Sequence, residues 1–406
     1  MCSNGICEDD FKLGEIMKIF QINTVYNSAS TGRIAADIKH ALEAEGHECF
    51  VAYGRGNSDE KNTECVSNKL DLYSHVFLTR ATDKTGMFSK KSTKRTIELI
   101  EEFGPDVIHL HNIHGYYLDY RMLFEFLAAY NKPIVWTLHD CWPYTGHCAY
   151  YDMAGCEKWK TGCHKCPALE QYPKAFVDNS KVNYETKKKY FNLVEKMVFV
   201  TPSKWLGNEV KKSFLGKYDV RVINNGIDTD CFKYTEGNIR EKYDLGDKKI
   251  VLGIASVWDK RKGLEDFVEL AEHLSSEYQI VLVGVSEQQI KQLPASIKAI
   301  RRTESKVELA QLYSAAEVLF NPTYEDNYPT VNLESLACGT PVITYNTGGS
   351  PESAFVDAKD CVEKKNYEEI CNRIYNVNKV EIDREKINIS QMKSAYLDLY
   401  VEMKEW

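Results

Sequence analysis

The sequence predicts an α/β protein with two doubly wound domains, each built on a parallel sheet that helices cover on both faces. Short apolar runs alternate with segments of helical periodicity almost throughout the 406 residues. The apolar runs are continuous, which is typical of strands buried on both faces of a parallel sheet. They fall into two successive series, and a chain of this length is typical of two domains.

The apolar runs are the expected strands. In the first half they are MKIFQI, ECFVAYG, DVIHLH, PIVWTLHD, MVFVTPS and VRVINNG. In the second half they are KIVLGIAS, YQIVLVGV, IKAIRR, EVLFNP and PVITYN. Amphipathic segments between them, such as 32–46, 265–276 and 306–317, predict helices. Doubly wound sheets bind ligands at the carboxyl ends of their strands, so we expect a site in the cleft between the domains.

Glycine and proline residues punctuate the chain between Val200 and Asp247, which predicts the domain boundary in this stretch. We expect an N-terminal extension at 1–16, a first domain at 17–205 with a Cys-rich loop at 141–167, a second domain at 206–385 and a terminal segment at 386–406. The terminal segment carries its apolar side chains on one helical face, so we expect it to pack back on the first domain.

Composition excludes several classes of protein. The formal net charge of −8 argues against a nucleic-acid binder, which normally carries a basic excess. The sequence contains no run of about 18 apolar residues, and its N-terminus lacks the apolar centre of a signal peptide. Thirteen cysteines without an export signal favour a reducing cytoplasm, with thiols that are free or bound to metal.

The segment DNYPTVNLESLACGTPVIT (326–344) contains two acids that flank a predicted helix start. Pro329 and Thr330 form the entry to the helix, and Gly339 follows its end. Asp326 then lies before the helix and Glu334 lies inside it. Carboxylates accept hydrogen bonds from hydroxyls, and a helix N-terminus attracts anions, so the segment is suited to a ligand with hydroxyls and a phosphate. The alternative is a surface helix with an ordinary acidic first turn.

Four further motifs accompany this segment in a fixed order. They are Ser203-Lys204-Trp205, Asn225-Gly-Ile-Asp228, Lys262-Gly263 and Gly348-Gly349-Ser350-Pro351-Glu352. From Met17 onward the series resembles the family 4 glycosyltransferases of the GT-B fold, which has two Rossmann-like domains. The stretches STGRIAADI, HLHNIHGYY, TLHDCWPYTGHC and DNYPTVNLE are similar to the branch that builds capsular, colanic-acid-like and other exopolysaccharides.

The resemblance implies a role for each residue of the donor site. Asp326 would hold hydroxyls of the donor sugar, and Glu334 would accept from the ribose hydroxyls. Arg261 and Lys262 would grip the diphosphate as its negative charge grows; the alternative for this pair is a solvated basic turn. The backbone N–H groups of Thr330 and Val331 would meet the phosphates.

Residues of the first domain complete the expected site. Gly32 and Arg33 are expected to open the first helix and face the cleft, where Gly32 would let a diphosphate or acceptor approach the backbone. His139 ends a strand, and its counterparts contact the donor sugar beside the reaction centre. His111 and His114 are expected on the acceptor side, although histidines at strand ends are often structural.

The sequence departs from the family pattern at two positions. Val257 stands where the family often carries an arginine, and Asp326 is one methylene shorter than the more common glutamate. Both differences bear on which donor the site accepts.

The resemblance implies a retaining glycosyltransferase that moves a hexose or related sugar from a nucleotide-diphosphate sugar, with UDP favoured on family frequency. The acceptor would be a growing, lipid-linked glycan at the inner face of the membrane. Such enzymes need no catalytic metal and no covalent nucleophile. The alternatives are a nucleotide-sugar epimerase on the same fold and a non-catalytic protein that binds sugar nucleotides.

Cys148, Cys156, Cys163 and Cys166 form the pattern C-x7-C-x6-C-x2-C, with His147 and His164 beside them. Four thiolates suit tetrahedral Zn²⁺, and a loop rich in glycine needs such a staple, so we expect a structural zinc site. The alternatives are four free thiols or disulfides. We also expect this loop to wall the acceptor pocket.

The segment from Arg80 to Arg95 carries six basic residues against one acid. Such a surface suits a peripheral contact with anionic lipid or a lipid-diphosphate acceptor. The alternative is an exposed loop followed by a helix start.

Overall fold

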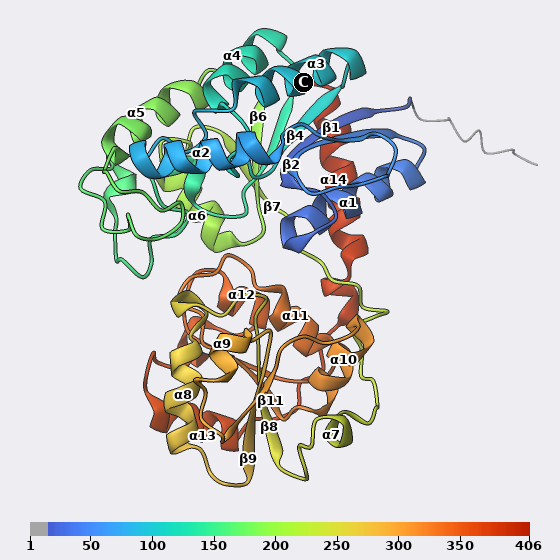
Figure 1. The fold of residues 1–406 in the computed structure, drawn as a ribbon. Coiled ribbons are helices and arrows are strands. Elements are labelled where there is room, and N and C mark those ends of the chain that lie inside the picture. The colour runs from blue at the N-terminus through green and yellow to red at the C-terminus, as the bar shows by residue number, and fades with distance from the viewer. Residues whose placement is uncertain (1–14) are drawn as a thin grey trace, which may run out of the picture.

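The computed structural model describes residues 15–406, and almost all of the expected N-terminal extension lies outside this range. The described chain forms two domains, each with one parallel sheet (Figure 1). The fold class predicted by the sequence is therefore confirmed.

The first sheet has seven strands in the order β3-β2-β1-β4-β5-β6-β7, all paired in parallel. Its strands are β1 (Lys18–Val25), β2 (Glu48–Arg55), β3 (Thr63–Cys65), β4 (Val107–Leu110), β5 (Ile134–Thr137), β6 (Met197–Thr201) and β7 (Asp219–Val222). Its helices are α1 (Ala29–Ala44), α2 (Lys69–Thr82), α3 (Lys90–Phe103), α4 (Tyr120–Tyr130), α5 (Ser180–Phe191) and α6 (Lys204–Lys212), with the short turns η1 (Trp142–Tyr144) and η2 (Lys158–Lys160).

The second sheet has five strands in the order β10-β9-β8-β11-β12, also all parallel. Its strands are β8 (Lys249–Ile254), β9 (Tyr278–Val283), β10 (Ile297–Ile300), β11 (Val318–Asn321) and β12 (Val342–Thr344). The helices are α7 (Ile239–Lys242), α8 (Leu264–His273), α9 (Glu287–Ile290), α10 (Lys306–Ala315), α11 (Thr330–Ala337), α12 (Ser350–Ala354), α13 (Tyr367–Tyr375) and α14 (Ile389–Lys404), with the turns η3 (Lys260–Lys262), η4 (Ala358–Asp360) and η5 (Arg384–Ile387).

Every apolar run that we expected to be a strand lies in one of these sheets, whereas β3 has no counterpart among them. The first sheet also continues past the boundary expected at 205/206. Strand β7 pairs with β6 from Val198↔Asp219 to Thr201↔Val222, so the first domain extends at least to Val222. The boundary at 205 is too early because β7 is a short edge strand whose partner is the strand just before it.

The terminal helix α14 crosses from the second domain to the first, where it lies beside the first sheet (Figure 1). Its buried apolar face joins a core with Met17, Ile19 and other residues of β1, β2 and α1. The residues of α14 in this core are Met392, Tyr396, Leu399, Tyr400 and Met403. Burial of each large apolar side chain is worth roughly 1.5–3 kcal/mol, so α14 ties the two domains together.

Direct hydrogen bonds also join the two domains, between the start of α6 and the second domain. The carboxylate of Glu352 accepts hydrogen bonds from the backbone N–H groups of Lys204 (2.8 Å) and Trp205 (2.7 Å) at the start of α6. A carboxylate at a helix N-terminus is favourable because it meets unpaired N–H groups and the positive end of the helix dipole. Ser203 donates to the side-chain oxygen of Asn327 at 2.9 Å. Among the described residues, no helix is long and apolar enough to cross a membrane.

Candidate active site

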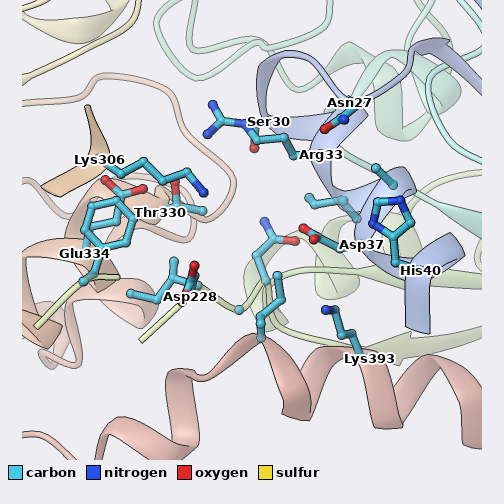
Figure 2. A pocket seen from close by; sticks show the side chains of 17 residues that line it. Asn27, Ser30, Arg33, Asp37, His40, Asp228, Lys306, Thr330, Glu334 and Lys393 are labelled. Atoms are coloured by element: carbon cyan, nitrogen blue, oxygen red, sulfur yellow. The ribbon is translucent and has the colours of Figure 1, made fainter. Parts of the chain in front are cut away.

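A cavity of about 430 Å³ lies in the cleft between the two domains. Figure 2 shows side chains of α1 on one side of it and side chains of the second domain on the other. The labelled residues on the α1 side are Asn27, Ser30, Arg33, Asp37 and His40, and those of the second domain include Asp228, Lys306, Thr330 and Glu334. The cavity therefore contains charges of both signs, as a site for a phosphorylated and hydroxylated ligand requires.

Helix α11 points its N-terminus into this cleft. The helix begins at Thr330 after Pro329, which offers no side-chain cap, so the first N–H groups of α11 are available to a ligand. A helix start at Pro329 and Thr330 was predicted from the sequence and is confirmed. Thr330 lines the cavity, while Val331 is partly buried among the apolar residues of the second core.

Glu334 lies one turn further along α11 and also lines the cavity. Tyr313 donates a hydrogen bond to its carboxylate at 2.9 Å. Burial raises the pKa of Glu334 to about 7, against the opposing effect of Tyr313 and the positive charges of Arg33 and Lys306. The carboxyl group therefore changes charge near neutral pH.

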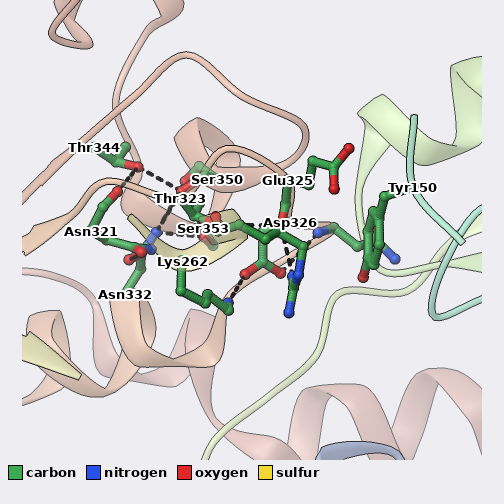
Figure 3. A network of polar contacts seen from close by, with 12 residues as sticks. Tyr150, Lys262, Asn321, Thr323, Glu325, Asp326, Asn332, Thr344, Ser350 and Ser353 are labelled. Atoms are coloured by element: carbon green, nitrogen blue, oxygen red, sulfur yellow. Dashed lines mark hydrogen bonds and ion pairs between the residues drawn. The ribbon is translucent and has the colours of Figure 1, made fainter. Parts of the chain in front are cut away.

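Asp326 forms an ion pair with Lys262 (Figure 3). Both side chains are mostly but not fully buried, with 14% and 20% of their surfaces exposed, so a ligand can still reach them. The backbone below Asp326 is fixed by Gly348, which has a φ of +57°. A Cβ atom there would lie 1.9 Å from the carbonyl oxygen of Asp326. Only glycine permits this approach.

Arg261 precedes Lys262 and faces the Cys-rich loop of the other domain. Its guanidinium lies 5.1 Å from the ring centre of Tyr150 and donates to the carbonyl oxygen of Glu325 at 2.8 Å. The turn that carries both cations ends at Gly263, whose φ of +72° and contact with Pro322 leave no room for a Cβ atom. Arg261 and Lys262 therefore emerge together beside Asp326.

Glu325 is a second buried acid that the sequence analysis did not single out. Its carboxylate accepts a hydrogen bond from the backbone N–H of Met153 at 2.9 Å, across the domain interface. Burial raises its pKa to about 7. Glu325 lies next to Asp326 but outside the recognised motif. Its partner Met153 is distant along the chain, so no sequence pattern indicates that the Cys-rich loop contacts Glu325.

A network of buried polar side chains holds α11 in place, next to the segment that carries Glu325 and Asp326. Asn332 accepts from Asn321 at 2.8 Å and donates to Ser353 at 2.9 Å, and Thr344 shares a 2.7 Å hydrogen bond with Ser350 (Figure 3). Buried polar groups that are fully paired fix a single arrangement of the elements that carry them. The network thus fixes where the N-terminus of α11 points.

His139 follows β5 and is partly exposed, whereas His111 behind it is buried. Their rings stack, with Nδ1 of His111 lying 3.1 Å from Nε2 of His139. Burial lowers the pKa of His139 to about 4, so its ring is neutral at physiological pH. We expected His111 on the acceptor side, but the structure places it in a second layer, where Gln21 holds its other nitrogen at 2.9 Å.

His114 is buried under Trp142 and pairs with an acid that the sequence analysis left unassigned. Its Nε2 atom lies 2.9 Å from Asp140, and its Nδ1 atom lies 3.1 Å from the hydroxyl of Tyr172. Both ring nitrogens of His114 thus have partners within the first domain. Of His114, Asp140 and Tyr172, only Tyr172 is exposed.

Gly32 differs from the prediction, whereas Arg33 faces the cleft as expected. Helix α1 begins at Ala29 rather than at Gly32, because Ser28 has extended backbone geometry and ends the preceding loop. A Cβ atom at Gly32 would lie 3.0–3.1 Å from Val25, so the small residue accommodates the end of β1. Arg33 is exposed and lines the cavity.

The four cysteines of the expected zinc site are brought together. Cys148, Cys156, Cys163 and Cys166 are free thiols that line one small cavity, with His147 and His164. In residues 15–406 no three His, Cys, Asp or Glu side chains are already arranged as a metal-binding group. The zinc site stays a prediction. The loop does border the cleft, since Tyr150 and Met153 contact the second domain.

The departure at Val257 leaves that side chain exposed, with no role in the site geometry. The next residue, Trp258, is buried and donates its indole N–H to the carbonyl oxygen of Val283 at 2.9 Å. Arg261 is therefore the residue that supplies a guanidinium on the turn η3.

Comparisons with known proteins agree with this geometry. Residues 31–231 match the model of "Glycosyltransferase Family 4", and residues 235–391 match that of "Glycosyl transferases group 1". The chain is 27% identical to the colanic acid biosynthesis glycosyl transferase WcaC of Escherichia coli K12, over 83% of this chain and 85% of the relative. It is 28% identical to the processive diacylglycerol alpha-glucosyltransferase of Acholeplasma laidlawii, over 36% of this chain and 47% of that relative.

Solved structures share the same fold. Sucrose-phosphate synthase from Thermosynechococcus elongatus superposes with a TM-score of 0.65 at 16% identity, covering 95% of this chain and 99% of that one. Anabaena Alr3699/HepE in complex with UDP-glucose superposes with a TM-score of 0.60 at 13% identity, covering 96% and 97%. The two family matches adjoin and together span both domains, and the fold is that of GT-B enzymes. The chain therefore belongs to the family 4 glycosyltransferases.

Proposed function

We propose that the protein transfers a hexose or related sugar from a nucleotide-diphosphate sugar to a growing glycan of an exopolysaccharide, with retention of the anomeric configuration. The observation that carries the proposal is the ion pair between Lys262 and Asp326, next to Arg261 and near the open N-terminus of α11. This arrangement offers positive charge for a diphosphate and a carboxylate for sugar hydroxyls in the same place.

In the proposed reaction the bond between the anomeric carbon and the diphosphate oxygen breaks, and a bond to the acceptor oxygen forms on the same face of the sugar. The acceptor proton passes to an oxygen of the departing phosphate. Arg261, Lys262 and the N–H groups of α11 stabilise the charge that develops on the phosphate. Asp326 orients the sugar, and neutral His139 lies at the end of β5 to contact it.

The carboxylates nearest this centre, other than Asp326, already have partners. Asp140 is hydrogen-bonded to His114, and Glu325 accepts from the backbone of Met153. A covalent nucleophile would need a free carboxylate next to the anomeric carbon. The same-face substitution in this proposal, in which the leaving phosphate acts as the base, follows from the resemblance to the family 4 glycosyltransferases.

UDP is the nucleotide that we favour. Three solved structures of Anabaena Alr3699/HepE, a protein with this fold, are complexes with UDP and glucose, with UDP-glucose and with UDP. Glu334 is placed on α11 to accept from the hydroxyls of a ribose, a role that does not depend on the base.

The acceptor in this proposal is lipid-linked, and helix α2 supports it. Its residues Leu70, Tyr73 and Phe77 follow a helical spacing of three and four, yet 81%, 68% and 71% of their surfaces are exposed. Exposed Phe176 lies at the end of the same helix, where its backbone N–H donates to the carbonyl oxygen of Arg80. An apolar stripe beside basic residues is typical of a surface that rests on anionic lipid.

Only some basic residues of the segment 80–95 are free to contact a membrane beside α2. Arg80, Lys84 and the lysines at the start of α3 are exposed. Arg95 is not available, because its guanidinium pairs with Glu64 at 2.8 Å and with two further glutamates of α3. The part of the segment nearest α2 is thus the part that suits a membrane contact.

A thermal-shift screen with UDP-, GDP- and dTDP-sugars tests the donor proposal. We expect a UDP-sugar to raise the melting temperature, and UDP-sugar consumption to require an added glycan acceptor. Stabilisation by none of these nucleotides would contradict the donor site. Nuclear magnetic resonance of the donor alone distinguishes transfer from epimerisation, since an epimerase would convert the sugar without an acceptor.

A further inference from the structure

We propose that the Cys-rich loop binds one structural Zn²⁺ ion through Cys148, Cys156, Cys163 and Cys166, and that this ion holds the loop against the second domain. The four thiols come from distant points of a loop with little regular structure, yet all line one cavity of about 10 Å³. A space of that size suits a single small ion. Because the thiols are not yet arranged as a metal group, they would turn toward the ion as it binds.

Sulfur contacts within the loop already resemble those around a metal-bound thiolate. The backbone N–H of Gly146 donates to the sulfur of Cys163 at 3.2 Å. Outer hydrogen bonds of this kind orient metal ligands and stabilise their negative charge.

Two buried basic groups lie close to the thiols. The ammonium of Lys187 is buried over the ring of Trp142 and donates only to the carbonyl oxygens of Trp142 and Thr145. Within residues 15–406 it forms no ion pair with a carboxylate. A Zn²⁺ ion with four thiolates carries a net charge of −2, which would compensate this buried cation.

His147 is the second basic group. Its Nδ1 atom is hydrogen-bonded to Asp83, whose other oxygen accepts from the backbone N–H of Asn179 at 2.9 Å. Its Nε2 atom is buried and has no hydrogen-bond partner in the described part of the chain. Because Nδ1 donates to the Asp83 carboxylate, Nε2 of the neutral ring has a lone pair and no partner in this cavity, so His147 is a candidate to replace one of the four thiolates as ligand.

The ion would act on the active site through the segment between two of its ligands. Cys148 and Cys156 enclose Tyr150, which lies over Arg261, and Met153, whose N–H donates to Glu325. Four protein ligands leave no open position for catalysis, so the role is structural. The effect of the ion on the active site rests on the proposed function, whereas the binding of zinc by the loop does not.

Metal content and X-ray absorption of the reduced, full-length protein test the site directly. We expect close to one zinc per chain and a first shell of sulfur atoms alone, at about 2.3 Å. The absence of zinc would overturn the proposal, and so would a sulfur–sulfur bond among the four cysteines. A shell with nitrogen at about 2.0 Å would overturn the four-cysteine ligand set and make His147 a ligand.

Variants separate the ligands from their neighbours. Cys163→Ser and Cys166→Ser should lose the zinc, whereas Cys141→Ser should retain it, since Cys141 is buried in the same loop outside the set. Retention of zinc in Cys163→Ser would overturn the assignment. If the serine variants do not fold, stepwise thiol modification of the native protein gives the answer, with zinc release expected as the four thiols react. The metal measurements involve no donor, so they fail or succeed independently of the proposed transfer reaction.

Discussion

Lys262 and Asp326 form an ion pair within the second domain, although the two residues are expected to bind different parts of the substrate. Each neutralises the other while no ligand is present. A diphosphate would take over the contact with Lys262, and sugar hydroxyls would take over the contact with Asp326. The pair therefore holds both side chains in place before the donor arrives, which lowers the cost of ordering them.

Asp326→Asn should separate binding from transfer. Asparagine has nearly the same shape but cannot bear the charge that orients the sugar, so we expect nucleotide affinity within a few-fold of the native value. The turnover number should fall roughly 10²–10³-fold, in line with the loss of one preorganised polar contact. Calorimetry with the nucleotide and initial rates with the full donor measure the two effects. Unchanged turnover would contradict the role assigned to Asp326.

Glu334 predicts a pH dependence of nucleotide binding. Its pKa is about 7, so the fraction of carboxylate rises between pH 6 and pH 8. A carboxylate accepts from both ribose hydroxyls, and we therefore expect nucleotide affinity to increase several-fold across this range. Glu334→Gln should bind more weakly and lose this part of the dependence, while titration of the nucleotide phosphate stays the same in both proteins.

The same group predicts the direction of a stability change. The folded pKa of Glu334 lies above the value of an unfolded glutamate, about 4.3, so the folded protein binds more protons between those two values. The contribution of Glu334 to stability is thus greatest at low pH and is lost as the pH rises through 7. In the absence of donor, the melting temperature of the Glu334→Gln variant minus that of the native protein should be larger at pH 8 than at pH 5.5. An equal difference at both pH values would contradict the raised pKa.

Much of the fold could be predicted because its signals are local. Buried parallel strands are continuous apolar runs, and all of those expected appear in the two sheets. Strand β3 was missed because it has three residues that are only partly buried. The early domain boundary has another origin: β7 was expected as a strand, but only its pairing with β6 assigns this mostly exposed edge strand to the first sheet.

The site could be predicted only where one motif contains the whole feature. The start of α11, with Asp326 before it and Glu334 inside it, lies in a single stretch of sequence. Contacts across the interface, such as Met153 with Glu325, join segments 172 positions apart and leave no local pattern. The sequence alone does not distinguish buried His111 from the more exposed His139, because both residues lie at the end of a strand.

Arg261 and Tyr150 predict a coupling between the Cys-rich loop and donor binding. Their contact lies at the domain interface, where the aromatic face supports the guanidinium. Arg261→Lys should reduce the turnover number roughly 10²-fold, since lysine cannot hold a phosphate through two parallel hydrogen bonds. Tyr150→Ala should mainly raise the Michaelis constant for the donor. In a double-mutant cycle the two effects should be less than additive, and full additivity would show that the contact does not position Arg261.

The apolar stripe of α2 predicts a membrane contact that can be removed without harm to the fold. Leu70, Tyr73 and Phe77 are largely exposed, so replacing all three by serine should change the melting temperature little. The native protein should sediment with vesicles that contain anionic lipid and dissociate as salt increases, since basic residues flank the stripe. The triple variant should stay in solution while retaining activity on a water-soluble acceptor. A control variant with exposed Tyr234, Val307 and Phe355 of the second domain changed to serine should sediment like the native protein. Equal sedimentation of both variants would contradict α2 as the membrane-facing surface.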